Sequence, residues 1–351
     1  MAASLLEFKT KRRKKKFGVF EVDELWVEHV LPQMRSRYLL LLNLFPDQVD
    51  RFGNISNIQK SLINALKKSP ATVLVYNCDD PNCQVVADEC ENNKLAFGID
   101  DKISNKQEEA KVKCPLCEFE LKYSLHQYAQ LGNYRCAKCG FNRANPKVST
   151  TNVILGKDYL EFSVNGKRYV SKKAAEYACY NLTGFVAVAN ALDCHNDSID
   201  KSIKYQQAKN GRMEFFELAG RQVMINLAKN PVGFNQNINY VLDRFYSDEQ
   251  PANTSVAFFV NAREGDGKNT NWLYDVNFES LVGNGNLDVL YGGEAFSDIA
   301  ECFRTKNIPA SRVENLKDLL EKASKSKHIY IIANYTAMFP LQEELTKLSS
   351  I

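Results

Sequence analysis

The sequence has no long apolar run. Its longest uninterrupted apolar stretch, residues 38–42, falls well short of the roughly 18 residues that a membrane-spanning helix needs. An N-terminal secretion signal is also missing, because the basic run at residues 9–16 is followed by short β-like segments and not by an apolar core. The hydrophobic fraction of 44% and charged fraction of 25% exclude disordered and fibrous proteins. We therefore expect a cytoplasmic globular protein of two or three domains.

Cysteine is too scarce for a small disulfide-stapled scaffold, with ten among 351 residues. Four of them form two close pairs, Cys114-Pro-Leu-Cys117 and Cys136-Ala-Lys-Cys139-Gly140. The interval between the pairs lies within the roughly 15–20 residues typical of a four-thiolate zinc ribbon. Such a zinc ion has no open coordination position, so the spacing predicts a structural metal; a redox pair is the alternative. The other six cysteines are expected to be buried free thiols.

Charge is unevenly distributed along the chain. The net charge is +3, yet residues 1–16 contain only one acidic residue, Glu7. Their basic residues are Lys9, Lys11, Arg12, Arg13, Lys14, Lys15 and Lys16. The remainder of the chain is mildly acidic. A basic run can bind nucleic acid or an anionic membrane face, but it is more often a solvated leader, and we assign residues 1–16 as a basic leader.

Short apolar segments alternate with helical patterns from residue 17 onward, which favours βα units around a largely parallel sheet. Strands are expected at 17–22, 38–45 and 71–77, with a helix at 54–68 between the last two. The composition then becomes polar, and the paired cysteines follow as an insertion at 110–145. Alternation around Asn165-Gly166 predicts a hairpin, and a helix is expected at 174–193.

A second alternation begins near residue 211. It predicts a compact Rossmann-like C-terminal domain over residues 206–351. The expected elements are strands at 222–227, 255–261, 287–291 and 328–332, and helices at 237–245, 295–304, 314–324 and 341–348.

Five strings in order carry a resemblance to a known family: FEVDE at 20–24, NLFPDQVDRFG at 43–53, NCDDP at 77–81, NGRMEFF at 210–216 and INLAKNPVGFN at 225–235. Together with the cysteine pairs, they resemble the MurT family, the Mur-ligase-like subunits of lipid II isoglutaminyl synthases. The resemblance implies an α/β fold: a truncated Mur ligase central domain at 17–205 with a zinc ribbon insertion, plus the C-terminal domain.

The resemblance also implies an activity. In that family ATP phosphorylates the α-carboxylate of D-glutamate in the lipid II stem peptide, and ammonia displaces the phosphate to give D-isoglutamine. The ammonia comes from a GatD-like glutaminase, with which the subunit forms a heterodimer. Expected cofactors are ATP, Mg²⁺ and the structural Zn²⁺. The substrate places the protein at the cytoplasmic face of the membrane, and no nucleic acid is expected as a partner.

Site residues follow from the matching strings. Glu21 in FEVDE would lie near Mg²⁺, a hard cation that prefers carboxylate ligands. Arg212 in NGRMEFF and Asn190 in the helix after the hairpin would contact the nucleotide, and Lys229 would lie at the interdomain site. Taken singly, Glu21 is a solvated or capping carboxylate, Arg212 is a helix or loop arginine, and Lys229 belongs to a turn.

Three departures from the family pattern stand out. No phosphate-cradling loop precedes Phe17, so the chain resembles an N-terminally shortened member, through a misplaced start or a true loss. The string at 265–270 imitates such a loop without its spacing. Asn269 stands where the family has an aspartate thought to assist the partner's cysteine and histidine, with Asp266 and Asp275 as substitutes, and Pro46 replaces a common arginine.

Two alternatives to an amidating subunit remain. A degenerate MurT-like chain could act as a binding or scaffold protein without ATP chemistry. A zinc-ribbon nucleic-acid binder using the basic leader is the other, and it explains the α/β remainder of the chain poorly.

Overall fold

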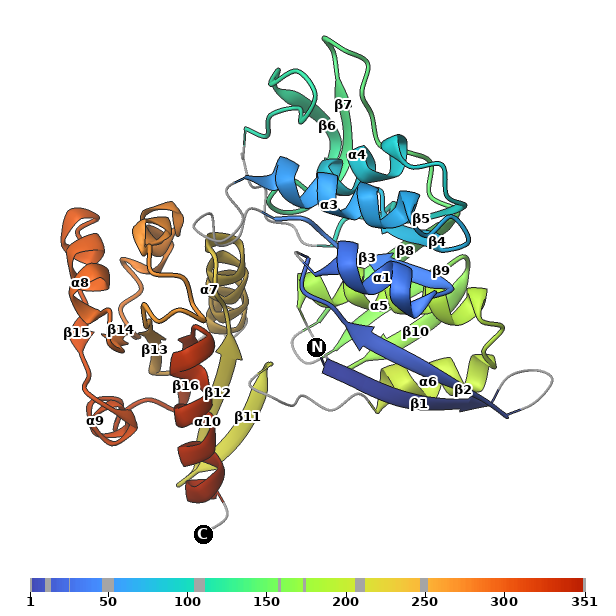
Figure 1. Ribbon diagram of the computed structural model, residues 1–351. Coiled ribbons are helices and arrows are strands. Elements are labelled where there is room, and N and C mark those ends of the chain that lie inside the picture. Colours follow the sequence, from blue (N-terminus) through green and yellow to red (C-terminus); the bar gives the residue numbers. More distant parts are fainter. Residues whose placement is uncertain are drawn as a thin grey trace. The chain divides into compact units, whose positions relative to one another are not determined.

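The computed structural model describes residues 2–9, 14–24, 26–45, 54–103, 111–156, 159–172, 175–205, 212–246 and 252–349. The chain divides into two compact units (Figure 1). The described residues up to 205 form the first unit, and those from 212 to 349 form the second. Both combine sheets with helices, as the expected α/β fold requires.

The first unit contains a six-stranded mixed sheet in the order β10-β9-β8-β5-β4-β3. Four strands run parallel: β3 (Tyr38–Leu41), β4 (Val73–Asn77), β5 (Lys94–Ile99) and β8 (Val148–Leu155). The edge is completed by the antiparallel strands β9 (Leu160–Val164) and β10 (Lys167–Ser171). The β9–β10 turn has positive φ at Asn165 and Gly166, which confirms the predicted hairpin.

Helices cover both faces of this sheet (Figure 1). α1 (Val27–Met34), α3 (Ile55–Lys67) and α4 (Pro81–Glu89) share one hydrophobic core with alternate residues of β4, such as Leu74 and Tyr76. α5 (Glu176–Ala191) packs on β3, β4, β5 and β8, and α6 (Asn196–Lys204) packs on β10. The helix predicted at 54–68 is confirmed, and Asn54 caps it by accepting a hydrogen bond from the N–H of Asn57.

The segment between β5 and β8 forms a small antiparallel hairpin. We call residues 111–145 the ribbon. It contains β6 (Leu121–His126) and β7 (Gly132–Cys136), and its own core joins Cys114, Leu121, Tyr134, Cys136 and Phe141. Val85 of α4 packs against this core, so the ribbon rests on α4 (Figure 1).

Residues 1–16, which we expected to be a basic leader, contribute β1 (Ala2–Lys9) and the start of β2 (Lys14–Glu21), which pair antiparallel. One expectation in the following segment needs correction. The strand expected at 38–45 ends at Leu41, and the string at 46–53, with Pro46, lies outside the described residues.

The second unit has a six-stranded sheet in the order β11-β12-β16-β13-β14-β15. Only β11 is antiparallel, to β12; the remaining neighbours are parallel, as a Rossmann-like domain requires. The strands are β11 (Glu214–Leu218), β12 (Arg221–Leu227), β13 (Thr254–Phe259), β14 (Leu287–Gly292), β15 (Ser311–Arg312) and β16 (His328–Ala333).

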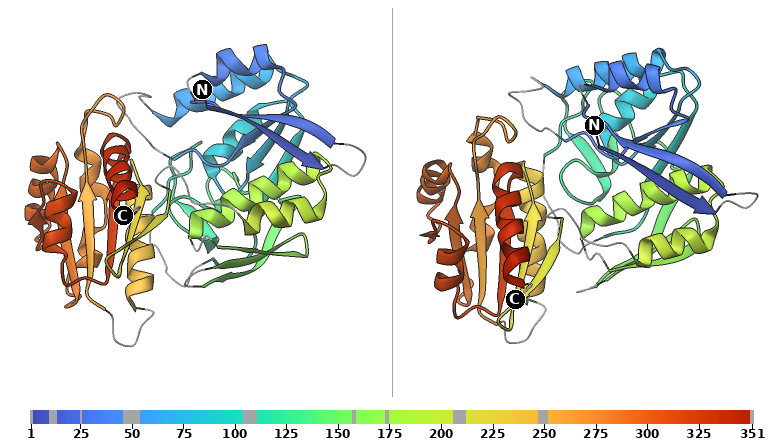
Figure 2. Two further views of the ribbon diagram at one scale, coloured as in Figure 1. Left: turned by 90° about the horizontal axis from the view of Figure 1, so that it is seen from below. Right: turned by 60° about the horizontal axis from the view of Figure 1, so that its bottom comes forward.

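Two layers of helices enclose this sheet (Figure 2). On one face lie α7 (Pro231–Tyr246), α8 (Phe296–Thr305) and the 3-10 turn η2 (Phe278–Leu281), which contact the sheet through the aromatic rings of Phe234, Phe258, Phe278 and Phe303. The 3-10 turn η1 (Asn271–Asp275) joins them through Trp272, whose ring contacts Phe234. α9 (Leu316–Lys322) and α10 (Tyr335–Ser349) bury an aliphatic core against the other face.

Two helices of this unit begin earlier than expected. α7 starts at Pro231, because the side chain of Asn230 accepts the N–H of Gly233 and Pro231 needs no donor partner in the first turn. α10 starts at Tyr335 and continues through Pro340. The predicted starts at 237 and 341 were therefore too late.

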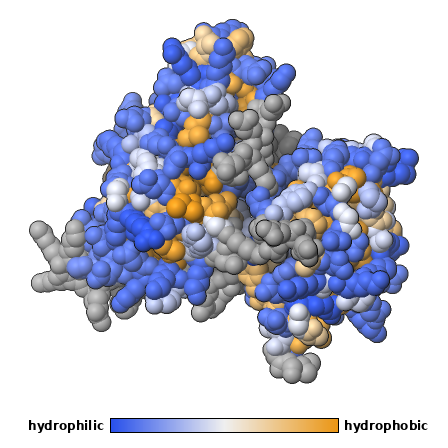
Figure 3. All heavy atoms as spheres, turned by 180° about the vertical axis from the view of Figure 1, so that it is seen from behind, coloured by the Kyte–Doolittle hydropathy of each residue, from blue (hydrophilic) through white to orange (hydrophobic). Residues whose placement is uncertain are grey.

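The described helices include none that is long and apolar enough to cross a membrane. Seen from behind, the surface is mainly hydrophilic, and hydrophobic side chains form small groups on it (Figure 3).

Candidate functional site

The four paired cysteines come together at one end of the ribbon. The sulfur atoms of Cys114, Cys117, Cys136 and Cys139 all lie within 4.8 Å of one another. Each pair sits on a tight turn, in which the N–H of Glu118 donates to Cys114 and the N–H of Gly140 donates to Cys136. Gly140 has a φ of +80°, a conformation that favours glycine. The predicted clustering is confirmed.

The ionisation of these thiols suits metal binding. Backbone N–H groups of Cys139 and Lys138 lower the pKa of Cys136 to about 6, whereas burial raises the pKa of Cys114 to about 12. A bound cation would favour the thiolate form of these cysteines and displace their protons. Four sulfurs from one hairpin are a donor set that a thiophilic ion such as zinc accepts in tetrahedral geometry.

The opposite end of the ribbon is attached to the carboxyl ends of the parallel strands. Gln127 donates to the carbonyl of Asp101 (2.7 Å), and Gln130 donates to that of Leu44 (3.2 Å). The N–H of Gly132 donates to the carbonyl of Asp79 (3.0 Å), and the hydroxyl of Tyr134 donates to that of Cys78 (3.2 Å). The turn of the hairpin is therefore part of this edge of the sheet, where parallel α/β sheets bind their ligands.

Asp79 is a fully buried carboxylate at this edge. It accepts hydrogen bonds from Nε of Arg143 (2.6 Å), the N–H of Ile99 (3.0 Å) and the hydroxyl of Tyr180 (2.8 Å). Burial raises its pKa, and the neighbouring Arg143 guanidinium opposes that shift. Arg143 also pairs with Asp100 at 2.8 Å.

Asp80 is buried beside it and has a different role. Its carboxylate accepts the N–H of Asn82 (2.8 Å), which caps α4, and the N–H of Leu44 (2.6 Å), which fixes the chain after β3. Burial raises the pKa of Asp80 to about 6. Neither role was predicted from the string NCDDP; the signal for both is an acidic pair directly after a buried strand.

The two predicted site residues of the first unit lie on separate elements. Glu21 is the last residue of β2, and Asn190 lies in the last turn of α5; both are exposed. Among the described residues, no hydrogen bond or ion pair joins these two side chains.

Arg212 and Lys229 lie on adjoining segments of the second unit, and both are exposed. Arg212 precedes β11, and Lys229 lies in the turn between β12 and α7. The segments are held together because the N–H of Met213 donates to the side chain of Asn226 on β12 (2.9 Å), and Asn226 donates to Asn237 on α7 (2.6 Å). Lys229 lies two residues before the start of α7, where a cation and the N–H groups of a helix N-terminus together favour an anionic ligand. Asn210 and Gly211 of the same string lie outside the described residues.

Asn269 lies in the loop that follows β13. It is exposed, and its side-chain oxygen accepts the N–H of Asn271 (2.8 Å). Asp266, by contrast, is buried and accepts both the N–H (2.9 Å) and the hydroxyl of Thr336 at the start of α10. Asp266 therefore anchors the loop, whereas Asp275 is exposed in η1.

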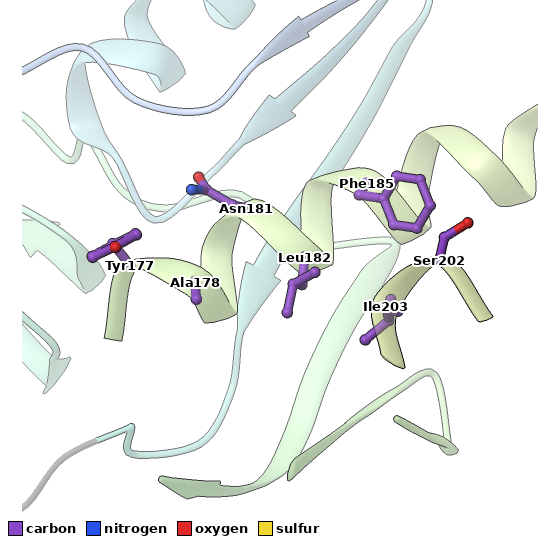
Figure 4. Close-up of a pocket in the computed structure, with 7 residues that line it drawn as sticks. All are labelled: Tyr177, Ala178, Asn181, Leu182, Phe185, Ser202 and Ile203. Atoms are coloured by element: carbon purple, nitrogen blue, oxygen red, sulfur yellow. The ribbon is translucent and has the colours of Figure 1, made fainter. Parts of the chain in front are cut away.

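A cavity of about 200 Å³ lies between α5 and α6 (Figure 4). Its lining is mostly apolar and comprises Tyr177, Ala178, Asn181, Leu182, Phe185, Ser202 and Ile203. Among the residues that the structure describes, none that lines it is a carboxylate, histidine, lysine or arginine.

Comparison with known proteins connects this geometry to two groups. The family model for the MurT ligase C-terminal region matches residues 227–338. The sequence is 29% identical over 356 aligned residues to the lipid II isoglutaminyl synthase (glutamine-hydrolyzing) subunit MurT of Streptococcus pneumoniae. That alignment covers 98% of this chain and 78% of the relative, so it includes both units and the ribbon.

Solved structures share the fold at lower identity. A pseudomurein peptide ligase type C from Methanothermus fervidus matches with a TM-score of 0.68 and 18% identity, covering 91% of this chain and 65% of that chain. MurF ligase from Thermotoga maritima in complex with ADP matches with a TM-score of 0.55 and 14% identity, covering 90% and 62%. The chain thus spans slightly less than two thirds of these ligases, and the expected Mur-ligase-like α/β fold is confirmed.

Proposed function

The chain belongs to the MurT family, and from this premise we propose that it is the ligase subunit of a lipid II isoglutaminyl synthase. The reaction would amidate the α-carboxylate of D-glutamate in the lipid II stem peptide to D-isoglutamine. The observation that carries the proposal is the extent of the similarity, which reaches 98% of the chain and is not confined to one unit. Because lipid II is a membrane lipid, the protein would act at the cytoplasmic face of the membrane.

The proposed chemistry requires activation of a carboxylate. A carboxylate resists nucleophiles until one of its oxygens becomes a good leaving group, and transfer of a phosphoryl group from ATP achieves this. Ammonia then displaces phosphate. The name of the Streptococcus pneumoniae relative, a glutamine-hydrolyzing synthase subunit, supports glutamine as the ammonia source. We assign the hydrolysis to a GatD-like glutaminase that pairs with this chain.

The exposed residues at the strand and helix ends fit nucleotide binding. Arg212 and Lys229 would place positive charge beside phosphate at the carboxyl end of β12, and Asn190 would contact the nucleotide from α5. Glu21 would hold Mg²⁺. The ADP complex of a ligase with the same fold supports a nucleotide site in this architecture.

The cysteine cluster would hold a structural zinc ion. Its support is the donor chemistry, four sulfurs within 4.8 Å of one another. A closed four-thiolate site supplies no reactive water, so the ion would stabilise the ribbon and take no part in amide formation.

The test is amidation by the complete complex. The chain is produced together with a glutaminase subunit, and lipid II is incubated with ATP, Mg²⁺ and glutamine; the released stem peptide is then weighed by mass spectrometry. The expected result is conversion of the acid to the amide, dependent on both ATP and glutamine. Lys229→Ala should lower the rate at least tenfold, whereas Lys317→Ala, on an exposed helix, should leave it unchanged.

One other result would reject the proposed activity, and another would reject only the role of Lys229. If the chain forms a stable complex with the glutaminase but the complex forms no amide, the result would support the scaffold alternative. Amidation that Lys229→Ala and Lys317→Ala affect equally would remove Lys229 from the nucleotide site.

A further inference from the structure

One of the contacts between the ribbon and the six-stranded sheet comes directly after the second cysteine pair. Phe141 and Arg143 follow Cys139 in the chain. The N–H of Cys136 donates to Phe141 (2.7 Å), and the N–H of Arg143 donates to Tyr134 on β7 (3.1 Å). The backbone of Arg143 is thereby fixed by the same short sheet that carries Cys136.

The side chain of Arg143 leaves the ribbon and enters the sheet edge. It is 5% exposed, and its Nε and Nη1 reach Asp79 at 2.6 Å and Asp100 at 2.8 Å. These carboxylates follow β4 and β5, the two central parallel strands. One cation from the ribbon therefore neutralises acidic groups at the ends of both strands.

The packing around this ion pair leaves little freedom. A Cβ atom added at Gly98 on β5 would lie 2.4 Å from the Asp79 carboxylate and 2.5 Å from the guanidinium. Asp79 in turn accepts the N–H of Ile99, so the backbone of β5 depends on the position of the carboxylate. A buried carboxylate that lost its cation would need to move or to be protonated.

We propose that Arg143 is a positioning residue that transmits the order of the four-cysteine centre to the carboxyl ends of β4 and β5. Metal bound at the cysteines would fix the turn after Cys139, that turn would fix Arg143, and Arg143 would hold Asp79 and Asp100. The inference rests on the proposed zinc centre. It extends the role of the ribbon from a separately folded insertion to a support for the edge where parallel sheets bind ligands.

Hydrogen exchange measured by mass spectrometry on the full chain tests this link. Zinc-loaded and chelated samples are compared. We expect chelation to speed exchange at least tenfold in the ribbon and also in the peptide that contains Ile99. Arg143→Met should speed exchange at Ile99 while zinc remains bound. Chelation of zinc from that variant should then cause little further increase in the exchange rate at Ile99. Arg143→Lys, which keeps the charge, should recover part of the protection.

Arg135→Met is the matched control. Arg135 is an exposed cation on β7 of the same ribbon, so its loss should leave exchange at Ile99 unchanged. Chelation that exposes the ribbon but leaves Ile99 protected would overturn the inference while the zinc centre stands. A chain that contains no zinc when purified would refute the centre itself, and with it the first step of the link.

Discussion

Arg143 and Asp79 form a buried ion pair across 64 positions of sequence. Nε of Arg143 lies 2.6 Å from Oδ1 of Asp79, and the side chains are 5% and 0% exposed. The pair joins the ribbon to β4. The net contribution of such a pair to the free energy of unfolding is small, because burial of both ions offsets much of their attraction. Removal of one partner is costly, because it leaves the other charge buried without compensation.

Arg143→Met should therefore lower the free energy of unfolding by about 3–5 kcal/mol, because Asp79 would remain buried without its cation. Urea denaturation followed by circular dichroism measures this change. Arg168→Met is the control: Arg168 pairs with Glu161 at the surface, and such pairs contribute only about 0–1 kcal/mol. Equal losses in the two variants would show that the Asp79 pair contributes no more than a surface contact.

Zinc content is the second prediction. We expect about one zinc ion per chain in purified protein, and loss of that ion when Cys114 and Cys136 are both changed to Ser, because two of four thiolate ligands disappear. Elemental analysis gives the ratio. Cys302→Ser, which changes a buried thiol of the second unit, should keep the metal. Retention of zinc by the double variant would contradict the assignment of these ligands.

Stability should also depend on the ionisation of Asp80. Burial raises its pKa from 3.8 to about 6, so the folded chain holds this proton more tightly than the unfolded chain does. The stabilisation is complete below about pH 4 and is lost as the pH rises through about 6. At about 1.4 kcal/mol per pKa unit, the difference is about 3 kcal/mol.

Comparison of the wild type with Asp80→Asn isolates this group. The variant loses an acceptor at every pH, but its amide does not titrate, so its unfolding free energy should lack the decline between pH 4 and pH 6. Urea unfolding at several pH values gives both curves. Parallel curves would mean that Asp80 does not titrate in this range.

Local chemistry could be predicted well from the sequence. The Asn165-Gly166 turn, the helix after Asn54 and the meeting of the four cysteines each depend on residues close in sequence, whose spacing fixes the geometry. The six other cysteines are buried free thiols, as expected. Errors occurred where local signals conflicted, as at Pro340, which continues a helix in spite of its missing N–H.

The contacts that integrate the ribbon could not be predicted in this way. Arg143 has no sequence pattern that distinguishes it from a solvated arginine, and its partner Asp79 precedes the ribbon by a strand and a helix. Gln130 likewise reaches Leu44 across 86 positions. Such contacts depend on the order of strands in the sheet, which hydrophobic periodicity does not determine.

The last prediction concerns Asn269 and the proposed glutaminase. If this exposed residue lies at the partner's catalytic histidine, its amide can orient the imidazole but cannot stabilise the imidazolium by charge. Replacement of an orienting aspartate by asparagine lowers turnover by about 10⁴ in a serine protease triad. The reverse change, Asn269→Asp, should therefore raise glutamine hydrolysis by the co-purified complex at least tenfold. Ammonia release from glutamine is the measurement.

Asn271→Asp provides the matched control for this experiment. It adds the same charge two positions away, on an exposed residue of the same loop. A general electrostatic effect would raise the rate of glutamine hydrolysis in both variants. Orientation of the histidine requires the carboxylate at position 269, so only Asn269→Asp would raise it. Asp266 is buried, and both of its oxygens accept hydrogen bonds from Thr336 at the start of α10, so it is less accessible to a partner than a carboxylate at position 269. Equal rates for the wild type and Asn269→Asp would show that the partner's cysteine and histidine need no third group from this loop.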